Sequence, residues 1–105
     1  MPLLGALLVH VSAAFAVVAV QDQPAPVDLL RQALDAGDSD QAQTIAEKWV
    51  ADEPGSGTAR LYLGFCFEQR GDGKADREFE RALELAPTDA ELTLQIADVY
   101  ATRYA

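Results

Sequence analysis

Residues 63–72 read LGFCFEQRGD, and residues 73–87 continue GKADREFERALELAP. The first segment is apolar and free of helix breakers up to Gly71-Asp72, a pair that is typical of a turn. The second has small and aromatic residues at helical spacing and ends at Pro87, which a helix cannot continue through. The stretch therefore predicts a helix, a tight turn and a second helix, with small residues where the two helices touch.

Three landmarks recur at one period along the chain. The Gly-Asp pairs at 37 and 71 are 34 residues apart, whereas the prolines at 54 and 87, and Leu63 and Ile96, are each 33 residues apart. An ordinary helical bundle would share the amphipathic pattern but not this common period. The spacing predicts an internal repeat of a helical hairpin.

The stretch resembles a tetratricopeptide repeat, whose pattern runs leucine-glycine, aromatic, alanine, aromatic, alanine and proline over about 34 residues. The resemblance implies an all-α fold, a right-handed stack of antiparallel helical hairpins (an α-solenoid) of about two and a half repeats over residues 27–105. The residues that carry this packing motif are Leu63, Gly64, Phe67, Ala75, Phe79, Ala82 and Pro87, repeated in part by Ile96, Ala97 and Tyr100.

Helices are expected over 27–36, from an Asp38 cap to Pro54, over 57–70, over 73–86, and from Thr88 to about 104. Asp38 with Gln41, and Thr88 with Glu91, match the capping-box pattern. Prolines at 24 and 26 are expected to exclude helix from residues 20–26, which read as a linker.

The first and third repeats depart from the motif. Leu30, Ala33 and Trp49 occupy positions where the motif has glycine, an aromatic residue and alanine, so the first hairpin must pack differently. The third repeat has only its first helix. Either that helix caps the stack, or the chain is a fragment of a longer array.

The charge distribution divides the chain. No charged side chain precedes Asp22, and the remainder carries the whole formal charge of −9, which disfavours nucleic acid as a partner. Residues 3–20 are apolar and favour an exported protein (periplasmic or secreted) with a cleaved signal peptide over 1–19, or a membrane anchor. No basic residue precedes this run, as a signal peptide usually requires.

In this family the first helices of successive repeats line a concave groove that holds a peptide or a partner's helix. Leu61 and Phe65 with Leu94 then form an apolar strip, or they pack within the core. Lysine and asparagine residues that clamp a carboxylate in some members are not at these positions. The groove-facing positions implied by the resemblance are Val27, Arg31, Leu61, Phe65, Glu68, Leu94 and Asp98.

No catalytic, cofactor or metal site is expected. His10 is the only histidine and lies in the apolar segment. Asp35, Asp38 and Asp40 cluster at one turn, but capping explains them better than the spacing of a calcium loop. Cys66, the only cysteine, is expected to be a small buried residue.

Two functions follow from these observations. The first is a non-catalytic scaffold that binds a protein or peptide in the groove, exported or attached to a membrane through residues 3–20. The alternative is a structural module that self-associates through residues 88–105, or a fragment of a longer array without a groove of its own.

Overall fold

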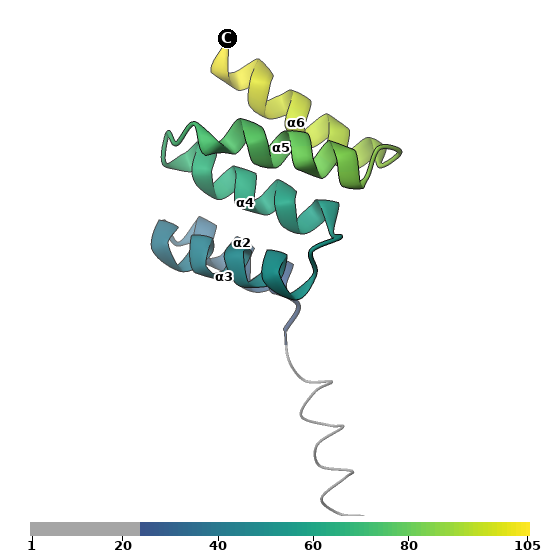
Figure 1. Cartoon of the computed structure of the whole chain (residues 1–105). Helices are drawn as coiled ribbons and strands as arrows, with labels where there is room; N and C mark the ends of the chain where they lie inside the picture. Colours follow the sequence, from purple (N-terminus) through teal and green to yellow (C-terminus); the bar gives the residue numbers. More distant parts are fainter. Residues whose placement is uncertain (1–23) are drawn as a thin grey trace, which may run out of the picture.

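The computed structural model describes residues 24–105, which are all-helical (Figure 1). This confirms the all-α prediction, whereas the predicted signal peptide or anchor lies outside the described residues. Among the described residues, no helix has the length and apolar composition needed to cross a bilayer. The helices are α2 (Pro26–Asp35), α3 (Ser39–Asp52), α4 (Gly57–Gln69), α5 (Lys74–Leu85) and α6 (Ala90–Arg103).

Each helix packs against the next one along the chain, and α6 contacts both α4 and α5. Figure 1 shows α2 beside α3 and α4 beside α5, with α6 lying over the second pair at the far end from α2 and α3. The helix α4 therefore occupies the middle of the structure, between the first pair and α6.

The two predicted Gly-Asp turns are built in the same way. Gly37 and Gly71 have φ angles of +75° and +69°, a left-handed conformation in which a side chain is strained. The next residue in each turn closes it: the Asp38 N–H donates to the Ala33 carbonyl and the Asp72 N–H to the Phe67 carbonyl, both at 2.9 Å. This is the hydrogen-bond pattern of a glycine-terminated helix, and it ends both α2 and α4.

The observed helix starts correct two predictions. Pro26 is the first residue of α2, because a proline is tolerated in the first turn, where its missing N–H is not needed. Asp89, not Thr88, caps α6, and its carboxylate accepts from the Leu92 N–H at 3.1 Å.

The predicted Asp38 cap is confirmed in part. The Asp38 carboxylate accepts from the Gln41 N–H at 3.1 Å. The return bond of a capping box is not made, since the Asp38 N–H is already used by the turn that ends α2.

The core is centred on α4, which buries residues on every side. Leu61, Leu63, Cys66 and Phe67 are all less than 9% exposed, as expected for a helix that is apolar around much of its circumference. The predicted burial of Cys66 is confirmed.

The α4–α5 contact depends on the absence of a side chain at Gly64. A Cβ placed there would lie 2.6 Å from Cδ1 of Phe79, whose ring is fully buried against the glycine. Ala75 and Ala82, also on α5, are fully buried. The ring of Phe79 thus takes the space that glycine leaves free, so the two helices can pack closely.

A second close approach joins α4 to the end of α5 and to α6. A Cβ at Gly57 would lie 2.8 Å from Cβ of Ala86 and 3.4 Å from a methyl of Leu92. Pro87 is exposed beside this junction, at the point where the chain leaves α5 for α6.

The third repeat of the motif is only partly buried. Ile96 is in the core and Tyr100 is half-buried, but Ala97 is exposed. Ala97 therefore does not take the packing role that its alignment with Gly64 predicts, because no described helix covers that side of α6.

The first hairpin packs differently, as its departures from the motif predict. Leu30, Ala42 and Ala46 are fully buried between α2 and α3. The Trp49 ring contacts the second pair of helices, with its centroid 5.8 Å from that of the Tyr62 ring. Its indole N–H donates to the Glu53 carboxylate at 2.8 Å. A buried tryptophan thus joins the two halves of the molecule while its polar atom stays bonded.

Candidate binding face

Two neighbouring recesses lie along α2, α4 and α6. The C-terminal recess, of about 440 Å³, is lined by Phe65, Glu68, Gln95, Asp98, Val99, Thr102 and Arg103. The N-terminal recess, of about 340 Å³, is lined by residues that include Val27, Arg31, Leu61, Tyr62, Asp89, Glu91, Leu92 and Gln95. Gln95 lines both, so the two recesses adjoin, and we call the surface they form the inner face.

Aromatic rings form the base of the inner face. Centroids are 5.4 Å apart between Tyr62 and Phe65, 5.9 Å between Phe65 and Phe79, and 6.2 Å between Phe79 and Tyr100. These pairs have edge-to-face geometry, which aromatic rings favour over direct stacking. The series extends through Trp49 to the first hairpin, and the half-buried Phe65 ring is held between Tyr62 of α4 and Phe79 of α5.

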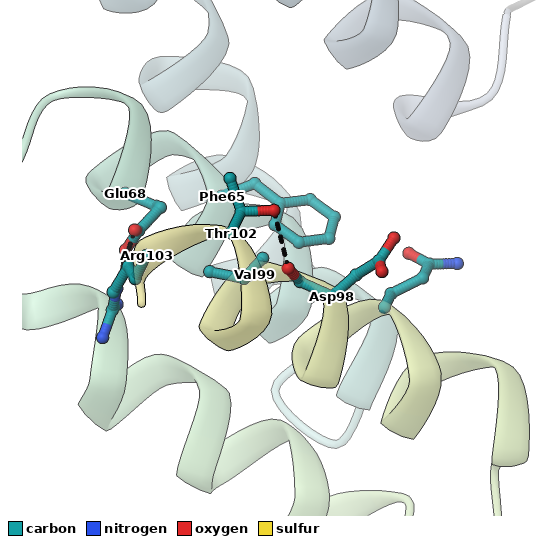
Figure 2. A pocket seen from close by; sticks show the side chains of 7 residues that line it. Phe65, Glu68, Asp98, Val99, Thr102 and Arg103 are labelled. Atoms are coloured by element: carbon teal, nitrogen blue, oxygen red, sulfur yellow. Dashed lines mark hydrogen bonds and ion pairs between the residues drawn. The ribbon is translucent and has the colours of Figure 1, made fainter. Parts of the chain in front are cut away.

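An ion-pair network closes one side of the C-terminal recess (Figure 2). The Arg103 guanidinium donates from Nε to Glu68 at 2.7 Å and lies 2.7 Å from the carboxylate of Asp76. The hydroxyl of Tyr100 donates to Asp76 at 3.3 Å. The network therefore ties α6 to both α4 and α5.

The same network shifts the titration of its members. The hydrogen bond from Arg103 holds the pKa of both Glu68 and Asp76 below its ordinary value, because it favours the ionised carboxylate. Conversely, the two carboxylates raise the pKa of Arg103. Burial raises the pKa of Tyr100. All three charged groups are therefore ionised near neutral pH.

Arg31 lies on one wall of the N-terminal recess. Its Nε and Nη2 donate to the Tyr62 hydroxyl at 3.2 and 3.0 Å, and its pKa is raised by that contact. Asp89 and Glu91, at the start of α6, also line this recess. The recess thus brings a cation from α2 and carboxylates from α6 to one opening.

The structure brings together most of the residues that the resemblance placed in a groove. Val27, Arg31 and Leu61 line the N-terminal recess, and Phe65, Glu68 and Asp98 line the C-terminal one. Of these, Leu61 is only 2% exposed, so it is a core residue as in the alternative reading. Their contact with a ligand stays a prediction.

Leu94 is not part of the inner face. It is 69% exposed and lines neither recess. The apolar strip of Leu61, Phe65 and Leu94 is therefore not formed. The α6 residues that line the C-terminal recess beside Arg103 are Gln95, Asp98, Val99 and Thr102, which recur at three- and four-residue intervals. That spacing was visible in the sequence, but it marks a mixed polar stripe that hydrophobicity alone does not select.

The described residues provide no arrangement for metal binding: they contain no group of three or more histidine, cysteine or acidic side chains that would hold an ion. Asp38 caps α3, and Asp40 pairs with Arg70. Burial raises the pKa of the Cys66 thiol to about 11, which keeps it protonated near neutral pH. Comparisons of the chain with protein-family models, with curated proteins and with solved structures found no match.

Proposed function

We propose that this chain is a scaffold of the tetratricopeptide repeat type, which binds a peptide or a partner's helix on its inner face and carries out no chemistry. The proposal rests on the fold and on the placement of the recesses. In such a scaffold the first helix of each hairpin contributes to one ligand surface, and here that set is α2, α4 and α6.

The repeat-type assignment is supported by contacts that recur along the chain. The turns at Gly37 and Gly71 share one hydrogen-bond pattern 34 positions apart. The Phe79 ring against Gly64 is the contact that the motif's glycine and aromatic residue would make. Hairpins of this kind bury their apolar faces by stacking on neighbours, as α3 does on α4.

The single observation that carries the binding role is the position of Gln95 in both recesses. Because it lies where they adjoin, an extended or helical segment along the inner face would contact residues from both. Binding of this kind needs anchor side chains in neighbouring pockets, and the two recesses supply such pockets.

The test is to block the place where the recesses meet. Gln95→Trp in the full chain fills this place whatever the charge of the ligand, and Gln32→Trp, at an exposed position of α2 outside both recesses, is the matched control. We expect affinity capture from a lysate of the native host to recover a partner with the unchanged chain and with the control, but not with Gln95→Trp. Equal recovery by both variants, with unchanged circular dichroism, would contradict the proposal.

We also propose that residues 3–20 direct the chain to export or anchor it in a membrane. Support comes from the uncharged run and from the triplets Val17-Val18-Ala19 and Ala14-Phe15-Ala16, either of which offers a cleavage site. Intact mass measurement of the protein made in its own host would give a chain lacking about 16 or 19 residues if the segment is cleaved. A full-length chain that stays with membranes after a carbonate wash would indicate an anchor, and a full-length soluble chain would contradict both.

A second candidate function, self-association through residues 88–105, is favoured by the outer side of α6. Leu94, Ala97, Ala101 and Tyr104 are exposed and recur at helical spacing, so they form one apolar stripe. If this stripe pairs two copies, Ala97→Glu should convert a dimer to a monomer in sedimentation experiments. A chain that is monomeric at all micromolar concentrations would rule this candidate out.

A further inference from the structure

The charges of the inner face are unevenly satisfied. Glu68 is fully engaged by Arg103, which also holds Asp76. The carboxylate of Asp98 is different: it lines the same recess, yet the ion pairs and hydrogen bonds of the described residues do not include it. Beyond the backbone bonds of α6, the hydrogen bond that Asp98 makes within the described residues is at its main-chain carbonyl, which accepts from the Thr102 hydroxyl at 2.9 Å.

The N-terminal recess repeats this imbalance. Among the described residues that line it, the one cation, Arg31, bonds to the neutral Tyr62 hydroxyl and is outnumbered by the carboxylates of Asp89 and Glu91. Within residues 24–105, the Glu91 carboxylate accepts one hydrogen bond, from the Gln95 amide at 3.4 Å. The uncompensated charge of the inner face is therefore negative, in a chain whose formal charge is already −9.

Apolar surface lies next to the free carboxylate. Figure 2 shows Phe65 and Val99 between Asp98 on one side and the Glu68–Arg103 pair on the other. The recess thus offers an aromatic ring, an aliphatic wall and an unpaired carboxylate within one opening of about 440 Å³. A single side chain that enters it would meet all three.

Lysine and arginine side chains match this combination. Their methylene stems cover apolar surface while the charged group stays at its edge, and a cation is attracted to the face of an aromatic ring. A carboxylate at the edge then accepts a charge-assisted hydrogen bond. An acidic side chain would instead meet Asp98 without a free cation in the C-terminal recess, because Arg103 already bonds two carboxylates.

We infer that the segment bound by the inner face is basic and apolar, and that one of its lysine or arginine residues occupies the C-terminal recess with its head group at Asp98. This inference rests on the proposed function, because it names the class of ligand for the same surface. The other classes, an acidic segment or a purely apolar one, are outcomes of its test.

The test uses three synthetic peptides of about twelve residues that share their leucine and alanine positions and carry lysine, glutamine or glutamate at the others. Each is titrated into the isotope-labelled full chain in non-ionic detergent, and backbone amide shifts are followed. We expect the lysine peptide to bind most tightly, to shift the amides of Phe65, Asp98 and Val99, and to weaken as salt is added.

Matched variants locate the charge that matters. Asp98→Asn should weaken the lysine peptide by about threefold to tenfold and leave the glutamine peptide unchanged. Asp35→Asn removes the same charge from an exposed position outside both recesses. The affinity of this variant for the lysine peptide should stay within about twofold of that of the unchanged chain. Both positions are exposed, so both variants are expected to fold.

The possible failures are distinguishable. If the glutamate or glutamine peptide shifts the inner-face amides as strongly as the lysine peptide, the basic class is wrong and the proposed function stands. If the lysine peptide shifts amides of α3 and α5 instead, the inner face is not the ligand surface and both proposals fail. Absence of binding by all three at millimolar concentration also overturns the inference, while the Gln95→Trp capture still tests the function.

Discussion

The helices α4 and α6 carry the same pattern 33 residues apart, yet they differ in what they bury. Leu61 on α4 is 2% exposed, whereas Leu94, its counterpart on α6, is 69% exposed. Gly64 receives the Phe79 ring, but Ala97 faces outward. Only the residues that face the body of the molecule, Ile96 and Leu92, are buried on α6 as on α4.

The difference comes from the number of neighbours. The helix α4 has α3, α5 and α6 against it, so nearly its whole circumference is covered. The helix α6 packs mainly against α4 and α5, and its contacts with them are fewer than those that α4 makes with α3 and α5. A repeat sequence therefore specifies which residues are able to pack, and the neighbouring helices determine which of them do so.

The largest expected effect is at Phe79, whose ring fills the α4–α5 contact. Phe79→Ala should lower the free energy of unfolding by about 3–5 kcal/mol, because it leaves a cavity against Gly64. The matched change on the open side of α6, Leu94→Ala, should stay within about 0.5 kcal/mol. Urea denaturation followed by circular dichroism measures both, and similar losses would contradict the contrast between the helices.

A side chain added at Gly64 should have the next largest effect. Gly64→Leu is expected to destabilise the fold by about 1–3 kcal/mol, since the new side chain overlaps the Phe79 ring. Ala97→Leu adds the same branched side chain at the aligned position, where it meets solvent. Its effect on the denaturation midpoint should be small, and a large loss there would show that another surface covers Ala97 in solution.

The N-caps provide a smaller test of how each helix begins. Asp89→Ala should cost about 1 kcal/mol, because the Leu92 N–H loses its acceptor. Thr88→Ala, at the position that the sequence pattern selected, should change stability by less than about 0.5 kcal/mol. A larger loss of thermal stability for Thr88→Ala than for Asp89→Ala would support the capping box that the sequence predicted at Thr88.

The smallest effect is local to α6 and depends on pH. Glu68 and Asp76 have a lowered pKa in the folded state, so their ion pairs with Arg103 stabilise the fold when both carboxylates are ionised, above about pH 5. This stabilisation is lost as the pH falls below their ordinary pKa values of 4.5 and 3.8. Amide hydrogen exchange in α6, corrected for its intrinsic pH dependence, should therefore speed up in acid relative to α4.

Arg103→Gln removes the cation common to both carboxylates and should flatten this pH dependence. At neutral pH the variant should exchange its α6 amides faster than the unchanged chain, because α6 has lost its charged link to α4 and α5. An unaltered pH profile in the variant would mean that the network does not hold α6.

The helices were predictable because their signals are local. Glycine at 37 and 71 adopts the left-handed conformation that ends a helix, and this follows from its missing side chain whatever the surroundings. The two errors at helix starts are also local: Pro26 is compatible with a first turn, and Asp89 competes with Thr88 for the cap of α6. When two adjacent residues are both suited to begin or cap a helix, the sequence pattern does not decide between them.

The candidate site was less predictable, since it combines residues of three helices. The resemblance to the repeat motif pointed to Phe65, Glu68 and Asp98, which share a recess. It missed Gln95 and put Leu94 in its place, one residue away, because a shift of one position turns a side chain by about 100° around the helix. The rotation of α6 about its axis depends on its packing against α4 and α5.

The amino-acid sequence by itself determined the helices, their turns and the small residues that permit close packing, because backbone conformation and steric size are properties of single residues and short segments. Only the tertiary structure decided that Leu61 belongs to the core, that Leu94 is exposed, and that Arg103 engages Glu68 and Asp76 while the Asp98 carboxylate has no ion pair within the part of the chain that the structure describes. Burial and charge pairing depend on contacts between side chains that are far apart in the sequence, and these contacts form only when the helices pack together.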